Sequence, residues 1–133
     1  MALHEPTLLV DQPARLALLV EDDSLVCTVV SRLLTSHGFT VMALSCGLDA
    51  LAAVQADASR FAIVVTDHSM PGMGGIELAR AITALRPDLP IILVSGYSRI
   101  DDAESPSANI RAFVRKPFTS KALGSAIASA LSQ

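Results

Sequence analysis

Charged and polar side chains follow four short apolar runs of this sequence, each at the point where the run ends. These side chains are Glu21 with Asp22, Asp67, Ser95 and Lys116. Carboxylates gathered in one place repel one another, so they either acquire a raised pKa or recruit a small hard cation. Oxygen ligands with room for water suit Mg²⁺. The compact Lys116 ammonium suits an anion such as a phosphoryl group, to which Ser95 could offer its hydroxyl.

The spacing of apolar residues predicts the elements that must position these groups. Short runs rich in β-branched residues predict strands, and a repeat of three to four residues predicts helices. The predicted strands are Arg15–Val20, Phe39–Leu44, Phe61–Asp67, Pro90–Val94 and Ala112–Arg115. The predicted helices run from a cap at Ser24 to Gly38, over Gly47–Ala56 with Leu48 among its apolar positions, from the glycine-rich turn to Arg86, and onward from Thr119.

Strands that alternate with helices in this way favour an α/β fold. Right-handed crossover connections then give a parallel sheet with helices on both faces. The carboxyl ends of parallel strands lie at one edge of a sheet, where open α/β folds place their chemistry. Asp67 is therefore predicted to stand at the end of a central strand, close to the other polar groups. Residues 101–109, which are acidic and rich in serine and contain Pro106, predict at most a short helix.

Length and composition predict a single compact domain. The 133 residues are 51% hydrophobic, which suffices for one core. Residues 15–133 form the predicted domain, and residues 1–14, with two prolines around a short apolar run, are interpreted as an extension or a linker remnant. The net charge of -3, the scattered basic residues and the few aromatic residues do not predict nucleic-acid binding.

Cysteine usage and hydropathy bear on the compartment. Cys27 and Cys46 share no metal-ligand spacing, so neither a disulfide nor a thiolate metal site is predicted, and a reducing compartment is favoured. No apolar run approaches the roughly 20 residues that cross a bilayer, and the chain starts without a basic signal region. We therefore expect a cytoplasmic domain without membrane contact, although its parent protein could be membrane-anchored.

Four motifs in order make the chain resemble the receiver domain of two-component response regulators. They are V-E-D-D from Val20, T-D-H-S-M-P-G-M-G-G from Thr66, V-S-G from Val94 and K-P-F from Lys116. The resemblance covers about residues 15 to 131, nearly the whole predicted domain. It implies a flavodoxin-like fold, doubly wound around a five-stranded parallel sheet with strand order 2-1-3-4-5.

The resemblance also implies roles for individual residues. Asp67 would be the phosphoacceptor, and Lys116 would pair with the phosphoryl group. Asp22 and Asp67 would bind Mg²⁺ directly, the backbone carbonyl of Ser69 would be a third ligand, and Glu21 would assist through water. The phosphoryl group would come from a histidine kinase, from a histidine phosphotransfer domain or from a small phosphodonor.

A switch and an expected cis peptide bond follow from the same resemblance. After phosphorylation of Asp67, the Ser95 hydroxyl would move toward the phosphoryl group, and the ring of Phe113 would enter the vacated space. Surface repacking would then change the interaction with a downstream protein partner. Phe113 lacks the hydroxyl of a tyrosine, so its bias is expected to be weaker. The bond between Lys116 and Pro117 would be cis.

Other readings stay open at this stage. A haloacid-dehalogenase-like phosphatase also uses an aspartate nucleophile and Mg²⁺, but it needs a second acid two residues later, where this chain has Ser69. A pseudo-receiver that only binds partners would lack part of the acidic pocket or the lysine. His68 is interpreted as solvated, because adjacent residues leaving a strand point apart.

The parent protein is also open. It could be a stand-alone regulator or a hybrid sensor kinase with this receiver at its carboxyl end, and the L-P-I-I-L-V-S-G-Y-S stretch favours the hybrid. As an isolated domain the chain is expected to catalyse only its own phosphotransfer and dephosphorylation. A hybrid parent would be a histidine kinase.

Overall fold

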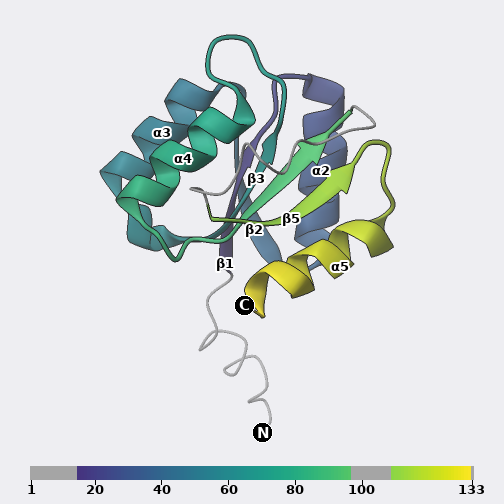
Figure 1. The fold of residues 1–133 in the computed structure, drawn as a ribbon. Coiled ribbons are helices and arrows are strands. Elements are labelled where there is room, and N and C mark those ends of the chain that lie inside the picture. The colour runs from purple at the N-terminus through teal and green to yellow at the C-terminus, as the bar shows by residue number, and fades with distance from the viewer. Residues whose placement is uncertain (1–14, 97–108, 133) are drawn as a thin grey trace, which may run out of the picture.

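The computed structural model describes residues 15–96 and 109–132 and shows one parallel sheet between two layers of helices (Figure 1). All neighbouring strands pair in parallel, in the order β2-β1-β3-β4-β5. The strands are β1 (Arg15–Val20), β2 (Phe39–Leu44), β3 (Phe61–Asp67), β4 (Ile91–Ser95) and β5 (Ile110–Arg115). The predicted flavodoxin-like strand order is therefore confirmed.

The helices cover both faces of the sheet. They are α2 (Ser24–Ser36), α3 (Gly47–Ala56), α4 (Gly75–Leu85) and α5 (Ser120–Leu131), with one short 3-10 turn, η1 (Ala58–Arg60). Figure 1 shows α2 and α5 on one face and α3 and α4 on the other. Within the described ranges, no helix is long and apolar enough to span a bilayer.

Two apolar cores flank the sheet because successive strand residues point to opposite faces. Leu19 and Val65 pack in the core beneath α2 and α5, whereas Leu18 and Val64 pack in the core beneath α3 and α4. Central strands buried on both faces need continuous apolar runs rather than an alternating pattern. For this reason, the central strands could be recognised in the sequence as short continuous apolar segments.

Two details of the sequence analysis are wrong. Ser24 was expected to cap the first helix, but the Asp23 carboxylate is the cap, because it accepts hydrogen bonds from the N–H groups of Leu25 and Val26 at 3.0 and 3.1 Å. Leu48 was assigned to the apolar pattern of its helix, but its side chain is 65% exposed. The buried residues of α3 are instead Gly47, Ala50 and Val54, which meet the sheet and α4.

Other expectations lie outside the described residues. These are the interpretation of residues 1–14 and nearly all of the segment 101–109 that was expected to hold at most a short helix.

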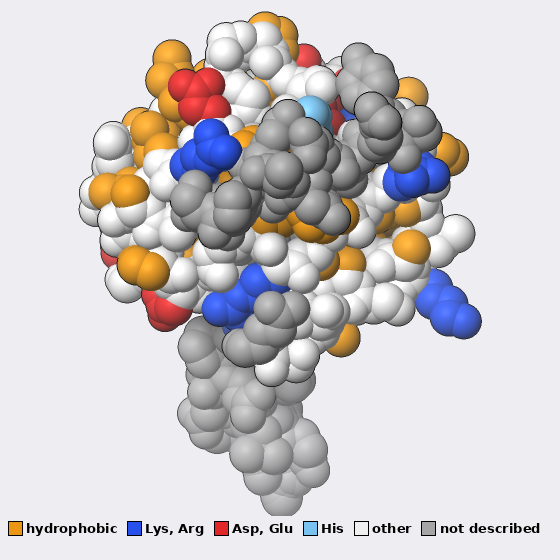
Figure 2. All heavy atoms as spheres, viewed as in Figure 1, with side chains coloured by type: hydrophobic (Ala, Val, Ile, Leu, Met, Phe, Trp, Pro, Cys, Tyr) orange, Lys and Arg blue, Asp and Glu red, His pale blue; other side chains and the backbone are white. Residues whose placement is uncertain are grey.

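On the face shown in Figure 2, the basic side chains of the described residues lie in separate groups rather than in one stripe.

The start of α4 comes unusually close to the end of β3. The Gly75 N–H donates to the carbonyl oxygen of His68 at 2.9 Å. A Cβ atom on Gly75 would lie 2.2 Å from the carbonyl oxygen of Asp67 and 2.9 Å from the Leu93 side chain. Because the first of these neighbours is backbone, it cannot move away without shifting β3 itself. Only a glycine allows the helix to begin this close to Asp67.

We therefore expect Gly75→Ala to lower the free energy of unfolding by about 1–3 kcal/mol, the usual cost of overpacking a tight contact. The measurement is urea unfolding followed by circular dichroism. The matched control is Gly96→Ala, whose Cβ would meet no atom of residues 15–96 and 109–132 within 4 Å. The control should change stability by no more than about 0.5 kcal/mol. Equal stability of the two variants would contradict the tight approach at Gly75.

Candidate functional site

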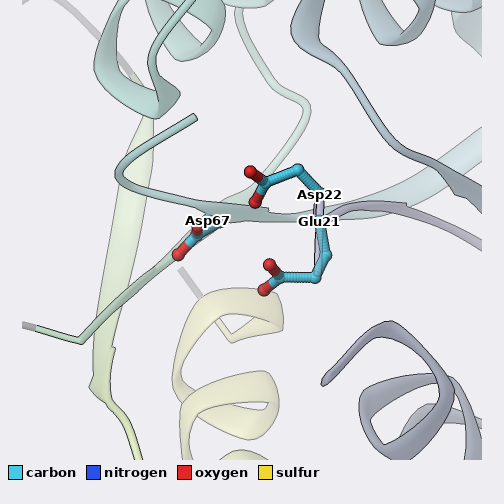
Figure 3. Close-up of side chains that lie close together, drawn as sticks. All are labelled: Glu21, Asp22 and Asp67. Atoms are coloured by element: carbon cyan, nitrogen blue, oxygen red, sulfur yellow. The ribbon is translucent and has the colours of Figure 1, made fainter. Parts of the chain in front are cut away.

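The carboxyl ends of β1 and β3 bring three carboxylates together (Figure 3). The strands are direct neighbours, with Val20 paired opposite Thr66, so the residues that follow them leave the sheet side by side. One oxygen from each of Glu21, Asp22 and Asp67 lies within 4.8 Å of the others. Glu21 and Asp67 are buried, at 4% and 6% exposure, while Asp22 is exposed.

A cation, Lys116, follows β5 and forms ion pairs with this cluster. Its Nζ donates to Glu21 Oε1 at 2.9 Å and lies 3.1 Å from Asp67 Oδ1. The backbone also fixes the residue, because the Lys116 N–H donates to the carbonyl oxygen of Ser95 at 2.7 Å. The ammonium therefore bridges carboxylates from two different strands.

Both oxygens of Glu21 accept hydrogen bonds. Oε1 accepts from Lys116, and Oε2 accepts from the Asp23 N–H at 3.1 Å. Burial nevertheless raises the pKa of Glu21 above its usual value, and the nearby Asp67 charge adds to this effect, while the two hydrogen bonds oppose it. The carboxylate of Glu21 is thus held in place in an environment that disfavours its charge.

The pKa of Lys116 is also raised. Burial on its own would disfavour the ammonium, but the hydrogen bonds to Glu21 and Asp67 and the attraction of both charges outweigh that effect. The two raised pKa values have different main causes, which are burial for Glu21 and the neighbouring carboxylates for Lys116. With three carboxylates and one ammonium, the cluster still attracts positive charge. A proton or a metal ion can supply it.

The donor set fits a small hard cation such as Mg²⁺. All of the candidate side-chain ligands are carboxylate oxygens, and Mg²⁺ prefers oxygen ligands with several waters retained. The exposed position of Asp22 and an adjoining hollow leave room for water. Glu21, Asp22, Ser24, Thr28, Ser45 and Asp49 are among the residues that line this hollow.

The remaining predicted site residues lie around the same edge of the sheet. Ser95 ends β4 and is fully buried, and Ser69 is exposed two residues after Asp67. The His68 ring is half-buried, with Nδ1 3.3 Å from Ser69 Oγ. Phe113 lies on β5 and is 38% exposed. The peptide bond between Lys116 and Pro117 is cis, as the resemblance implied.

One contact of the site was missed from the sequence. It is the direct ion pair between Glu21 and Lys116, which lie 95 positions apart and left no local signal. An aspartate directly before a helical pattern is a common N-cap, and Asp23 does cap α2, while its N–H orients Glu21.

Comparison with known proteins agrees with this geometry. The response regulator receiver domain family matches residues 17–128. Chemotaxis protein CheY of Pseudomonas aeruginosa is 36% identical over 110 residues, which cover 80% of this chain and 87% of that protein. A crystal structure of a response regulator receiver protein from Sinorhizobium medicae WSM419 is 29% identical, with a TM-score of 0.81 over 90% of this chain and 95% of that chain.

Longer proteins also match, over a small part of their length. The C4-dicarboxylate transport transcriptional regulatory protein DctD of Rhizobium meliloti is 39% identical over 106 residues, which are 79% of this chain and 23% of that protein. Sensor kinase CckA of Brucella abortus is 36% identical over 111 residues, which are 83% of this chain and 12% of that protein. A sensor kinase is therefore one of several kinds of protein among the relatives. Since one family match spans most of the chain and the fold and acidic cluster agree with it, this chain belongs to the response regulator receiver domain family.

Proposed function

We propose that Asp67 accepts a phosphoryl group from a phosphohistidine of a partner protein and that this changes the surface offered to a downstream partner. The partner would be a histidine kinase or a histidine phosphotransfer domain, as membership in a two-component family implies. The observation that carries the proposal is the position of Asp67, a buried strand-end carboxylate that is bridged by Lys116 to Glu21 and lies within 4.8 Å of Asp22.

Mg²⁺ is the proposed cofactor of this site. Asp22 and Asp67 would be direct ligands, the Ser69 carbonyl oxygen a third, and Glu21 would act through water. When bound, the ion supplies positive charge that offsets the carboxylates and the transferring phosphoryl group. The assignment is supported by the three carboxylate oxygens within 4.8 Å of one another, which a single ammonium only partly neutralises.

In the proposed reaction, a carboxylate oxygen of Asp67 attacks the phosphorus in line with the leaving imidazole. A phosphorus–oxygen bond forms, the phosphorus–nitrogen bond breaks, and its electron pair stays on the imidazole. Lys116 shifts its hydrogen bond from the carboxylate toward an equatorial phosphoryl oxygen, where developing negative charge needs a donor. Backbone N–H groups near His68 and Gly96 are the proposed further donors. Water later attacks the acyl phosphate, so the modification is transient.

The switch would pass from Ser95 to Phe113 across two neighbouring strands. Leu93 pairs opposite Phe113, and Leu93 and Ser95 lie two residues apart on β4. Residues two apart on a strand share a face, so Phe113 lies on the same side of the sheet as Ser95. Movement of the Ser95 hydroxyl toward a phosphoryl group would open space for the ring of Phe113, which is partly exposed before the switch.

Two alternatives are less consistent with the site. A phosphatase of the haloacid dehalogenase type would need an acid two residues after Asp67, and this position is Ser69. A pseudo-receiver without phosphorylation would not need to keep three carboxylates and a lysine within contact of one another. The parent protein stays a proposal between a stand-alone regulator and a hybrid sensor kinase, because relatives of both sizes match.

The role of Asp67 as the phosphoacceptor can be tested directly. Incubation with acetyl phosphate and Mg²⁺ should add one phosphoryl group to the intact protein, observed by mass spectrometry, and chelation of Mg²⁺ should prevent the addition. Asp67→Asn should abolish it, because an amide is not the required nucleophile. Asp88→Asn is the matched control, since Asp88 is an exposed acid paired with Arg86. Equal mass gain in Asp67→Asn would remove this residue from its proposed role.

The role of the Lys116 ammonium in phosphoryl transfer can be tested by substitution. Lys116→Ala should retain Mg²⁺ affinity, measured by titration calorimetry, because it removes a cation that occupies the same carboxylates. Its phosphorylation rate should fall about 10²-fold, the usual effect of losing one donor to a developing charge. Lys121→Ala, the other lysine of the chain, is the control and should match the wild type. An unchanged rate in Lys116→Ala would show that its ammonium does not assist the transfer.

A further inference from the structure

The helices α2 and α5, which cover one face of the sheet, contact each other at a point away from the acidic cluster. His37 follows α2 as its C-cap, and its ring Nε2 is 3.1 Å from the carbonyl oxygen of Ser120, the first residue of α5. A carbonyl oxygen can only accept, so Nε2 carries the hydrogen and donates it. The Ser120 hydroxyl oxygen lies 3.3 Å from the same nitrogen. The imidazole thereby joins the end of one helix to the start of another.

The ring of His37 packs against Gly124 of α5, where no side chain is present. A Cβ atom on Gly124 would lie 2.7 Å from Cε1 and 3.2 Å from Nε2 of His37. Glycine within a helix costs stability relative to alanine, and Gly124 lies well inside α5. The absence of a side chain at Gly124 therefore has a physical reason, because the imidazole of His37 occupies the place where that side chain would be.

The contact restrains a short segment that includes Lys116. Only Pro117, Phe118 and Thr119 separate Lys116 from Ser120. The Lys116 end of this segment is held by its N–H bond to Ser95 and by its ion pairs. The other end is held by His37. Between the two ends, Pro117 and Phe118 face α2 across an apolar groove of about 440 Å³.

We propose that His37 is a positioning residue, whose imidazole, seated on Gly124 and bonded to Ser120, holds the segment 116–120 against α2 and so keeps the Lys116 ammonium between Glu21 and Asp67. The contact itself is independent of the proposed function. Its consequence for phosphoryl transfer rests on that function, because it acts through Lys116.

The seat on Gly124 is tested by a stability cycle. In the wild-type background, Gly124→Ala should lower the melting temperature, because the new methyl group displaces the imidazole. In a His37→Ala background, the same Gly124→Ala change should raise it by about 3–5 °C, the gain expected from replacing a helical glycine in a domain of this size. Both substitutions are at half-buried positions, so each variant should fold. An equal increase in both backgrounds would overturn the proposed seat.

The effect on Lys116 is tested by amide hydrogen exchange, which requires no phosphorylation. His37→Ala should reduce protection of the Lys116 and Ala122 amides about two- to tenfold, the range expected for losing one hydrogen bond. His37→Gln, which can still donate to the Ser120 carbonyl, should restore protection. The Val26 amide, bonded to Asp23 at the far end of α2, is the internal control. Unchanged protection of Lys116 in His37→Ala would overturn the positioning role.

Phosphorylation by acetyl phosphate supplies the functional measurement. His37→Ala should slow mass gain in the wild-type background and should have no further effect in a Lys116→Ala background, because the imidazole acts only through that lysine. Independent effects in the two backgrounds would overturn the route through Lys116. If the wild-type protein gained no mass, the proposed function would fail, while the stability cycle and the exchange measurement would still decide the contact of His37.

Discussion

The structure of the site depends on the repulsion among three carboxylates that two adjacent strands hold within 4.8 Å. Glu21 and Asp67 are buried, so water screens their charges poorly. Lys116 offsets part of this charge through contacts of 2.9 and 3.1 Å, but a single ammonium leaves the cluster negative. An arrangement of this kind attracts further positive charge, which agrees with the Mg²⁺-dependent phosphoacceptor role proposed for Asp67.

The fold imposes this proximity through backbone constraints. Parallel pairing places the ends of β1, β3, β4 and β5 at one edge, and the Lys116 N–H bond to Ser95 fixes the direction in which the chain leaves the sheet. The close approach of α4 at Gly75 determines where the chain turns after Asp67. Each constraint acts on the backbone, so the packing of the whole sheet fixes the positions from which the charged side chains extend.

Local sequence patterns were sufficient for the α/β fold class and for the expectation that Glu21, Asp22, Asp67 and Lys116 lie close together. Strand and helix ranges followed from the period of apolar residues, because buried strands and amphipathic helices each have a characteristic spacing. The predicted strands 15–20, 39–44 and 61–67 agree with β1, β2 and β3. The strand order came from resemblance to a family rather than from the periodicity, which specifies elements but not their neighbours. Two errors were also local: Asp23 rather than Ser24 caps α2, and Leu48 faces solvent.

By itself, the sequence determined which side chains end the strands, and therefore that acids, a serine and a lysine would meet at one edge of a sheet. Tertiary structure alone decided which of them touch. The Glu21 pairing with Lys116 and the His37 contact with Ser120 and Gly124 join positions that are more than 80 residues apart. Such contacts depend on the packing of helices against the sheet and on the direction of each side chain, and neither leaves a periodic signal in the sequence. The physical reason is that spacing along a chain encodes the local backbone, whereas distance across a fold is set by all the packed elements together.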